Sequence, residues 1–277
     1  MDLYYETSDG QKIDLMNGPI YAISPETLTG STWEYSTISG VNGLGRVKRF
    51  YKDAQERKLT VGIMADTKEE FNTIMYGLHR AFERDVRRLK PGKLWWNDFY
   101  KEVYAVDTSQ EEFEEYFESI NRDITFMSVY PYWIHKKTYQ FFDASTYAGT
   151  HDFDDYDFEY DYDHEGVIEI VDNDCIDAAN FEIIFYGPAQ NPNVTIGGHM
   201  YEVLTDLEEG EYVIVNSLRK TVRQYNLDGT EENIFYLRGR DQYIFEPIPS
   251  GNMAIERSKD QKLDVIIYDE RGEPDWI

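Results

Sequence analysis

The sequence predicts an α+β N-terminal domain, sandwich-like and with one long helix, followed by an all-β sandwich. Three observations support this. One segment of helical period lies between period-two segments in the first half, an acidic-aromatic run follows, and short apolar runs between turn residues fill the second half. We expect domains at 1–145 and 167–277, joined by a linker at 146–166. The 277-residue length also favours two domains.

The long helix is predicted after residue 66. Asp66-Thr67-Lys68-Glu69-Glu70 supplies an N-cap with Glu three residues later. Apolar residues then follow at helical spacing: Phe71, Ile74, Met75, Leu78, Phe82, Val86 and Leu89. Pro91-Gly92 is expected to end the helix. The arginines of its last turns fit the negative end of a helix dipole and a solvated face better than a binding patch, which stays an alternative.

Strands are expected on both sides of this helix. Period-two patterns occur at Leu59-Val61-Ile63, at Leu94-Trp96 and through Val103 and Ala105. A second, Glu-rich helix is expected from Ser109 to Tyr116, and a further strand from Ile124 to Tyr130, before Pro131.

The acidic-aromatic run spans residues 151–166. Within and after it, Asp161, Asp163, Glu165 and Asp172 imitate the oxygen spacing of a calcium-binding loop. Glu165 is long for its position, Asp172 is short for a closing bidentate ligand, and the flanks alternate as strands do. A solvated acidic linker is therefore favoured, with a metal site at these four residues as the weaker alternative.

The second half shows repeated short apolar runs and no helical period. The predicted strands are Phe181 to Tyr186, Val194 to Ile196, Met200 to Leu204, Tyr212 to Val215, Thr221 to Tyr225, Tyr243 to Phe245, and Leu263 to Tyr268. Glycine-containing turns separate several of them. These features predict an antiparallel sandwich.

Charge and composition exclude several classes. The net charge is −26, with 18 basic and 22 acidic residues in 1–140 and 9 and 31 in 141–277, so we expect DNA only as passing cargo. One cysteine, Cys175, and five histidines predict no disulfide, zinc site or cofactor. No run of about 18 apolar residues and no signal-peptide pattern occur, so we expect a cytoplasmic protein without membrane insertion.

Motifs for catalysis are also missing. The sequence has no His-Glu-x-x-His, Gly-x-Ser-x-Gly or P-loop, and Gly40, Gly43 and Gly45 suit a hairpin better than a phosphate loop. Among 53 acidic residues some carboxylates must lie close together by chance, so no enzyme is predicted. Asn191-Pro192-Asn193 suits a turn better than a sugar contact.

The order of elements resembles the siphophage distal tail protein family over nearly the whole chain. The segments that carry the resemblance are Gly40–Tyr51, the helix near 67–90 with Gly92-Lys93-Leu94 after it, Tyr130–Trp133, Tyr160–Asp163, Asn191–Ile196 and Ile248–Met253. Asn193 stands where sugar-binding galectins have Arg.

The resemblance implies a non-enzymatic virion protein. Six copies would form a ring at the tail tip, with a galectin-like jelly roll as the second domain. Partners would be the tail tube protein, the tail-associated lysin or tip protein, and receptor-binding proteins, after assembly in the host cytoplasm. The basic strand would clasp a neighbouring copy through Gly43, Arg46, Lys48, Arg49 and Tyr51. A carbohydrate-binding module for host glycans is the alternative function, and an enzyme with paired carboxylates is a third.

Overall fold

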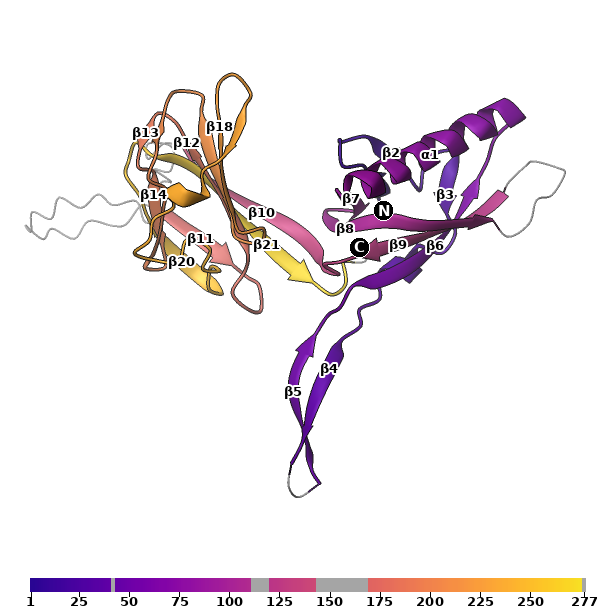
Figure 1. The fold of residues 1–277 in the computed structure, drawn as a ribbon, viewed down its shortest axis with the longest axis horizontal. Helices are drawn as coiled ribbons and strands as arrows, with labels where there is room; N and C mark the ends of the chain where they lie inside the picture. Colours follow the sequence, from indigo (N-terminus) through magenta and orange to yellow (C-terminus); the bar gives the residue numbers. More distant parts are fainter. Residues whose placement is uncertain (41–42, 111–119, 143–168, 276–277) are drawn as a thin grey trace, which may run out of the picture. The chain divides into compact units, whose positions relative to one another are not determined.

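The computed structural model describes residues 1–40, 43–110, 120–142 and 169–275 (Figure 1). The chain divides into two compact units: unit 1 comprises Met1–His135 and Glu270–Ile277, and unit 2 comprises Lys136–Asp269. The chain thus returns to unit 1 at its C-terminal end, which no local pattern indicated. The expected linker at 146–166 lies outside the described residues, and the expected domain boundaries remain predictions.

Unit 1 is built from strands and one long helix. The strands are β1 (Leu3–Glu6), β2 (Lys12–Asp14), β3 (Ile20–Ala22), β4 (Glu34–Ser39), β5 (Gly45–Tyr51), β6 (Gln55–Ile63), β7 (Gly92–Trp96), β8 (Phe99–Gln110), β9 (Ile120–Ser128) and the start of β10 (Trp133–Phe141). Two short stretches of antiparallel sheet meet at β8: one runs β10-β8-β7-β1-β2 and the other β8-β9-β6-β3. A short 3-10 helix, η1 (Pro25–Leu28), precedes β4.

The helix α1 (Lys68–Arg88) confirms the predicted long helix. Thr67 is its N-cap: the Thr67 Oγ1 accepts a hydrogen bond from the Glu70 amide at 3.1 Å. The Glu70 carboxylate in turn accepts from the Asp66 amide at 3.0 Å. These contacts satisfy amide groups that the first turn of a helix leaves unpaired.

The end of α1 differs from the prediction. Leu89, and not Pro91-Gly92, ends the helix, because it adopts a left-handed conformation with φ 52° and the Lys90 amide donates back to the Asp85 carbonyl at 3.1 Å. Gly92 instead opens β7. A Cβ there would lie 2.2 Å from the Tyr5 hydroxyl oxygen, so only glycine lets the two strands approach this closely.

The core of unit 1 lies between α1 and the sheets. Leu78 and Phe82 of α1 are buried with Tyr5 of β1 and Phe126 of β9. The Tyr5 and Phe82 rings meet edge to face with centroids 5.1 Å apart. Figure 1 shows α1 lying across β8. One face of the helix is therefore covered, and its opposite face is exposed.

The predicted second helix is wrong at its start. Ser109 and Gln110 belong to β8 and pair with Asp123 and Arg122 of β9. Pairing with β9 thus decides the conformation of Ser109 and Gln110, in place of the local helical preference. Residues 111–119 lie outside the described residues.

Unit 2 contains two larger antiparallel sheets. Its strands are the remainder of β10, β11 (Glu169–Asn173), β12 (Phe181–Tyr186), β13 (Ala189–Gln190), β14 (Asn193–Ile196), β15 (His199–Glu202), β16 (Asp206–Leu207), β17 (Tyr212–Asn216), β18 (Thr221–Tyr225), β19 (Glu231–Asn233), β20 (Gly251–Glu256) and β21 (Lys262–Arg271). One sheet has the order β19-β18-β17-β12-β21-β10 and the other β11-β20-β14-β15; β13 pairs with β16, and η2 (Phe235–Leu237) is a 3-10 turn.

Both sheets contribute to one core. Phe181, Ile183 and Phe185 of β12 are fully buried in it, together with Val194 and Ile196 of β14 from the other sheet. Two antiparallel sheets around one core confirm the predicted sandwich. Its likeness to galectins stays a prediction.

One predicted strand of unit 2 is wrong. Tyr243–Phe245 forms a turn, not a strand, although Ile244 and Phe245 are buried. The Phe245 ring stacks on that of Phe235 with centroids 5.9 Å apart. The apolar residues here close the side of the core, so their burial does not require strand pairing.

Candidate assembly interface

Strands β4 and β5 form an arm that extends from unit 1 (Figure 1). They pair with each other as a separate two-stranded sheet, and with no other strand of the described chain. The Gly40 amide donates to the Leu44 carbonyl and the Gly43 amide to the Gly40 carbonyl, each at 3.0 Å, which closes the turn at the tip. Gly43 has φ +73°, a conformation that favours glycine.

One face of the arm is apolar. The register pairs Tyr35 with Phe50 and Thr37 with Val47, which places all four side chains on the same face. Tyr35, Val47 and Phe50 are 63%, 52% and 61% exposed. The Tyr35 and Phe50 rings lie 6.4 Å apart across the two strands. Large apolar side chains thus face solvent in a part of the molecule that has no core of its own.

The opposite face is basic. Arg49 is paired with Ser36, Arg46 with Ile38 and Tyr51 with Glu34, so Arg46, Arg49 and Tyr51 share this face. The Arg49 guanidinium lies 4.8 Å from the centre of the Tyr51 ring. Lys48 has no partner in the register and is the extra residue of a bulge.

Three side chains fix the base of the arm to the segment that leads into it. Arg57 donates to the Gly30 carbonyl at 2.8 Å, Gln55 to the Thr32 carbonyl at 2.8 Å, and Lys52 to the Ser31 hydroxyl at 2.9 Å. The Lys52 ammonium also lies 4.3 Å from the centre of the Tyr132 ring. Burial lowers the pKa of Lys52, and the charge of Glu273 partly opposes that shift.

A buried lysine lies near this base. Lys101 of β8 is only 4% exposed, and its ammonium sits 4.5 Å from the centre of the Trp133 ring. It lines a cavity of about 10 Å³ with Arg57 and Ser128. Burial, together with the smaller effects of the charges of Arg57 and Lys52, lowers the pKa of Lys101 to about 7. The base of the arm therefore holds a local excess of positive charge.

These features suit binding of a protein surface. An isolated two-stranded hairpin is marginally stable in water, and its outer edges carry unpaired amide and carbonyl groups. A partner could pair with an edge, cover the apolar face and complement the basic one. Residues 34–51 hold three basic residues and one acidic residue in a chain of net charge −26, so the surface of another copy is a complementary partner.

All the residues predicted for the interface lie in the arm: Gly43 in its tip, and Arg46, Lys48, Arg49 and Tyr51 on β5. Their role in assembly stays a prediction. Tyr35, Val47 and Phe50 were not predicted as interface residues. The apolar face becomes evident only when the strand register and the bulge at Lys48 are known.

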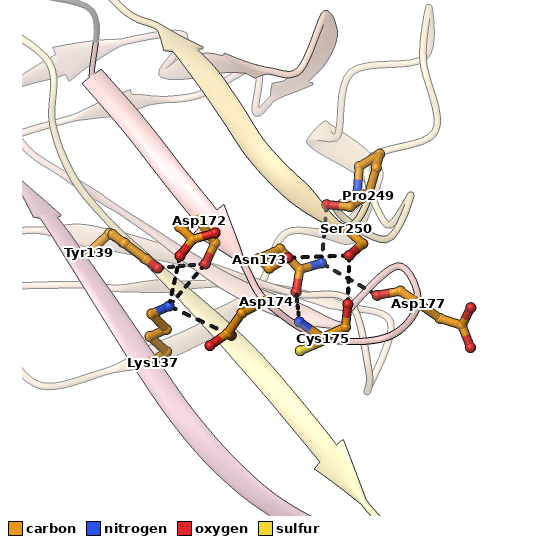
Figure 2. Close-up of polar contacts among 9 residues, drawn as sticks. All are labelled: Lys137, Tyr139, Asp172, Asn173, Asp174, Cys175, Asp177, Pro249 and Ser250. Carbon is orange, nitrogen blue, oxygen red and sulfur yellow. Dashed lines mark hydrogen bonds and ion pairs between the residues drawn. The ribbon is translucent and has the colours of Figure 1, made fainter.

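The four residues of the calcium alternative are only partly described. Asp161, Asp163 and Glu165 lie outside the described residues, while Asp172 is the second-last residue of β11 and lies close to Lys137 of β10 (Figure 2). The Lys137 ammonium lies 3.5 Å from the Asp172 carboxylate and 3.6 Å from that of Asp174.

The neighbouring loop is held by Asn173. Its amide nitrogen donates to the Ile248 and Pro249 carbonyls at 2.8 and 3.1 Å, and its side-chain oxygen accepts from the half-buried Cys175 at 3.1 Å (Figure 2). These bonds fix a turn of unit 2. They do not test the calcium alternative, which stays a prediction.

Within the described ranges, no group of three or more His, Cys, Asp or Glu side chains is placed to hold a metal ion. Among the helices described, none is long and apolar enough to cross a membrane.

The whole described chain has the fold of phage baseplate and tail-hub proteins, which confirms the resemblance noted in the sequence at the level of fold. Sequence comparison alone does not find this likeness: no family profile and no curated protein matches the chain.

Particular structures make the likeness specific. A chain of the phage P2 baseplate in its activated conformation with Ca superposes with TM-score 0.65 at 13% identity, covering 99% of this chain and 100% of that one. The corresponding structure with Sr gives TM-score 0.66 at 14% identity, with 99% and 100% covered. The Dit protein of phage SPP1, a hub of the adsorption apparatus in phages that infect Gram-positive bacteria, gives TM-score 0.60 at 13% identity, with 97% and 98% covered.

Proposed function

We propose that this chain is a non-enzymatic structural subunit of a phage tail. Six copies close into a ring, the distal hub, which joins the tail tube to the tip or baseplate and its host-adhesion machinery. The observation that carries the proposal is the β4–β5 arm, exposed on both faces, in a chain that shares its fold with baseplate and hub proteins over nearly its whole length. Contacts between unlike surfaces of identical copies form rings when the rotation closes.

In this ring each arm lies on the neighbouring copy. Burial of Tyr35 and Phe50 provides the hydrophobic contribution, and the face with Arg46 and Arg49 meets acidic surface. The carboxylates that face a central channel repel phosphate, so DNA passes through as cargo without binding.

The other partners follow from this position in the virion tail. They are the tail tube protein on one side, and a tail-associated lysin or tip protein and receptor-binding proteins on the other, joined during assembly in the host cytoplasm. Unit 2 serves as a galectin-like jelly roll and provides the surface for such contacts. Its two antiparallel sheets around one core support this part of the proposal.

Charge reversal in the arm tests the proposal. The variant Arg46→Glu, Lys48→Glu, Arg49→Glu removes the basic face and leaves the core of unit 1 untouched, because all three side chains are exposed. We expect it to be folded but to lose the ring in light scattering coupled to size exclusion. The matched control is Arg240→Glu, Lys259→Glu, Lys262→Glu, which makes the same charge change at exposed sites in unit 2. An intact ring in the arm variant, or equal loss in the control, would contradict the role of the arm.

A further inference from the structure

The small cavity near the base of the arm lies wholly within unit 1. Apolar side chains form much of its wall, among them Leu94, Val103 and Phe126, and Lys101 and Ser128 are polar members of the lining. Its volume of about 10 Å³ is room for one particle of about the size of a water molecule. The cavity therefore suits a single water or a monatomic ion, and it is too small for sulfate, phosphate or an organic ligand.

Lys101 lines this cavity without a counter-ion. Its side chain is 4% exposed, and its ammonium lies 4.5 Å from the centre of the Trp133 ring. Among the residues that the structure describes, none forms a hydrogen bond or ion pair with this ammonium. A buried charge is normally paired, because its removal from water is costly. When Lys101 is charged, an acceptor is thus missing on the side of the cavity.

The rest of the described lining does not supply this acceptor charge. No Asp or Glu is part of it. The Ser128 hydroxyl and the Nε of Arg57 are buried and themselves have no hydrogen-bond partner within the described ranges. Both atoms are covered by their neighbours, so the Lys101 ammonium is the group that would contact an ion directly.

The charged groups around Lys101 make the site more positive. The two charges that act on it belong to Arg57 and Lys52, and both are cations. The carboxylates of the C-terminal return act on other groups: Glu273 on Lys52, and Glu270 on the Tyr130 hydroxyl, from which it accepts a hydrogen bond at 2.6 Å. The potential at the cavity therefore favours an anion over a neutral water.

We propose that this cavity is a binding site for one monatomic anion, chloride in physiological solution, held by the ammonium of Lys101. Chloride carries the single negative charge that the group of cations lacks. It is only slightly larger than a water molecule, so small movements of the lining admit it. The site does not depend on the arm or on the proposed ring.

Anion binding at this site is coupled to the protonation of Lys101. Its pKa is about 7, lowered chiefly by burial. The ammonium is present below pH 7 and is lost as the pH rises through 7. An anion that binds only the charged form raises this pKa, and by linkage its own affinity falls as the pH rises.

The test is urea unfolding of the unaltered protein at pH 6 and at pH 9, with sodium chloride replacing sodium gluconate at constant ionic strength. Constant ionic strength holds the general screening of charges fixed. Tryptophan fluorescence follows unit 1, because all five tryptophans fall within its residue ranges. At pH 6 we expect the free energy of unfolding to rise with chloride as it does for one bound ligand. At pH 9 the apparent affinity should be at least tenfold lower.

Two variants and one structure locate the binding. Lys101→Met removes the ammonium and should abolish the chloride dependence at pH 6. Lys93→Met, at a half-exposed lysine of β7, removes the same charge and should retain the dependence. Bromide, which replaces chloride and is located by its anomalous X-ray scattering, should lie within hydrogen-bond distance of the Lys101 Nζ in crystals of the unaltered protein.

Three results would overturn the proposal. The first is an equal free energy of unfolding in chloride and gluconate at pH 6. The second is a chloride dependence in Lys101→Met as large as in the unaltered protein. The third is a cavity that holds a water molecule and no bromide.

Discussion

Lys101 is the residue whose environment differs most from that expected of its type. It is 4% exposed and contacts the Trp133 ring, and the apolar side chains of Leu94, Val103 and Phe126 line the same cavity. A lysine in such a place favours its neutral form, which explains why its pKa falls to about 7. The signal for its burial is its position two residues before Val103 on β8, since alternate residues of a strand share a face.

The consequence is a defined dependence of stability on pH. In the unfolded chain Lys101 titrates near 10.4, whereas in the folded protein its pKa is about 7. Between these values the unfolded state binds more protons, so the free energy of unfolding rises with pH. The energetic penalty for burying the charged Lys101 side chain has its full value below pH 7 and disappears as the pH rises to about 10.

We predict that Lys101→Met raises the free energy of unfolding at pH 7 by about 2–4 kcal/mol and makes it less dependent on pH between 7 and 10. Urea unfolding at a series of pH values measures this. Lys93→Met, at a half-exposed lysine of β7, is the control and should leave the slope unchanged. A free energy of unfolding that depends more steeply on pH in Lys101→Met than in the unaltered protein would contradict the lowered pKa of Lys101.

Asp85 is another buried charged residue of unit 1, and its carboxylate is satisfied by hydrogen bonds. Its carboxylate accepts from the Tyr5 hydroxyl at 2.7 Å and from the Ser8 hydroxyl at 2.6 Å. Burial raises the pKa of Tyr5, and the bond to Asp85 raises it further. Tyr5 therefore donates to Asp85 throughout the physiological range.

We predict that Tyr5→Phe lowers the free energy of unfolding by about 1.5–3 kcal/mol, because it leaves a buried carboxylate short of one donor. Chemical denaturation measures the change. Tyr4→Phe is the matched control: that ring stacks on Trp95, and its hydroxyl has no hydrogen-bond partner among the described residues. A loss as large in Tyr4→Phe as in Tyr5→Phe would contradict this interpretation.

At the scale of elements, the β4–β5 arm lies apart from the core of unit 1, so its proposed role in assembly places no demand on stability. Its two faces contribute nothing to the core of unit 1, so side chains on them are free to serve a partner. The apolar face is expected to provide most of the affinity, since exposed charge pairs contribute little.

We predict that Tyr35→Ser with Phe50→Ser weakens association between copies by about 3 kcal/mol or more, roughly a hundredfold, without changing the melting temperature of the monomer. Sedimentation equilibrium measures the association. The control Leu227→Ser with Tyr236→Ser removes apolar side chains of comparable exposure, 67% and 60%, from unit 2 and should have no effect. Unchanged association in the arm variant would show that the apolar face is not buried.

The elements that sequence analysis predicted well are those with a strong local period. The α1 helix follows from its capping residues, and β12 and β18 have the predicted bounds. Ser109 and Tyr243–Phe245 were mispredicted because pairing with β9 and closure of the core, respectively, are non-local. Local periodicity therefore predicts individual helices and strands, whereas the pairing of strands depends on the whole fold.

The candidate interface was also predictable only in part from the sequence. The basic residues of β5 are visible as a run, but the apolar face depends on cross-strand register. The return of the chain to unit 1 is also non-local: the Trp96 indole donates to the Asp275 carbonyl at 3.2 Å, and the Tyr130 hydroxyl to Glu270 at 2.6 Å. No sequence period encodes contacts over such separations.

At the scale of the whole molecule, charge decides how copies can meet. A net charge of −26 makes copies repel one another unless a basic surface is placed at the contact. The β4–β5 arm carries such a basic surface. The acidic excess is concentrated in residues 141–277, whose net charge is opposite to that of the arm.

The most direct test of the assembly model is the mass of the unaltered protein in solution, by light scattering coupled to size exclusion, with negative-stain images of the same fractions. We predict a mass of six copies and rings with a central hole. A strict monomer at every concentration, also in the presence of the tail tube protein as a template, would contradict it.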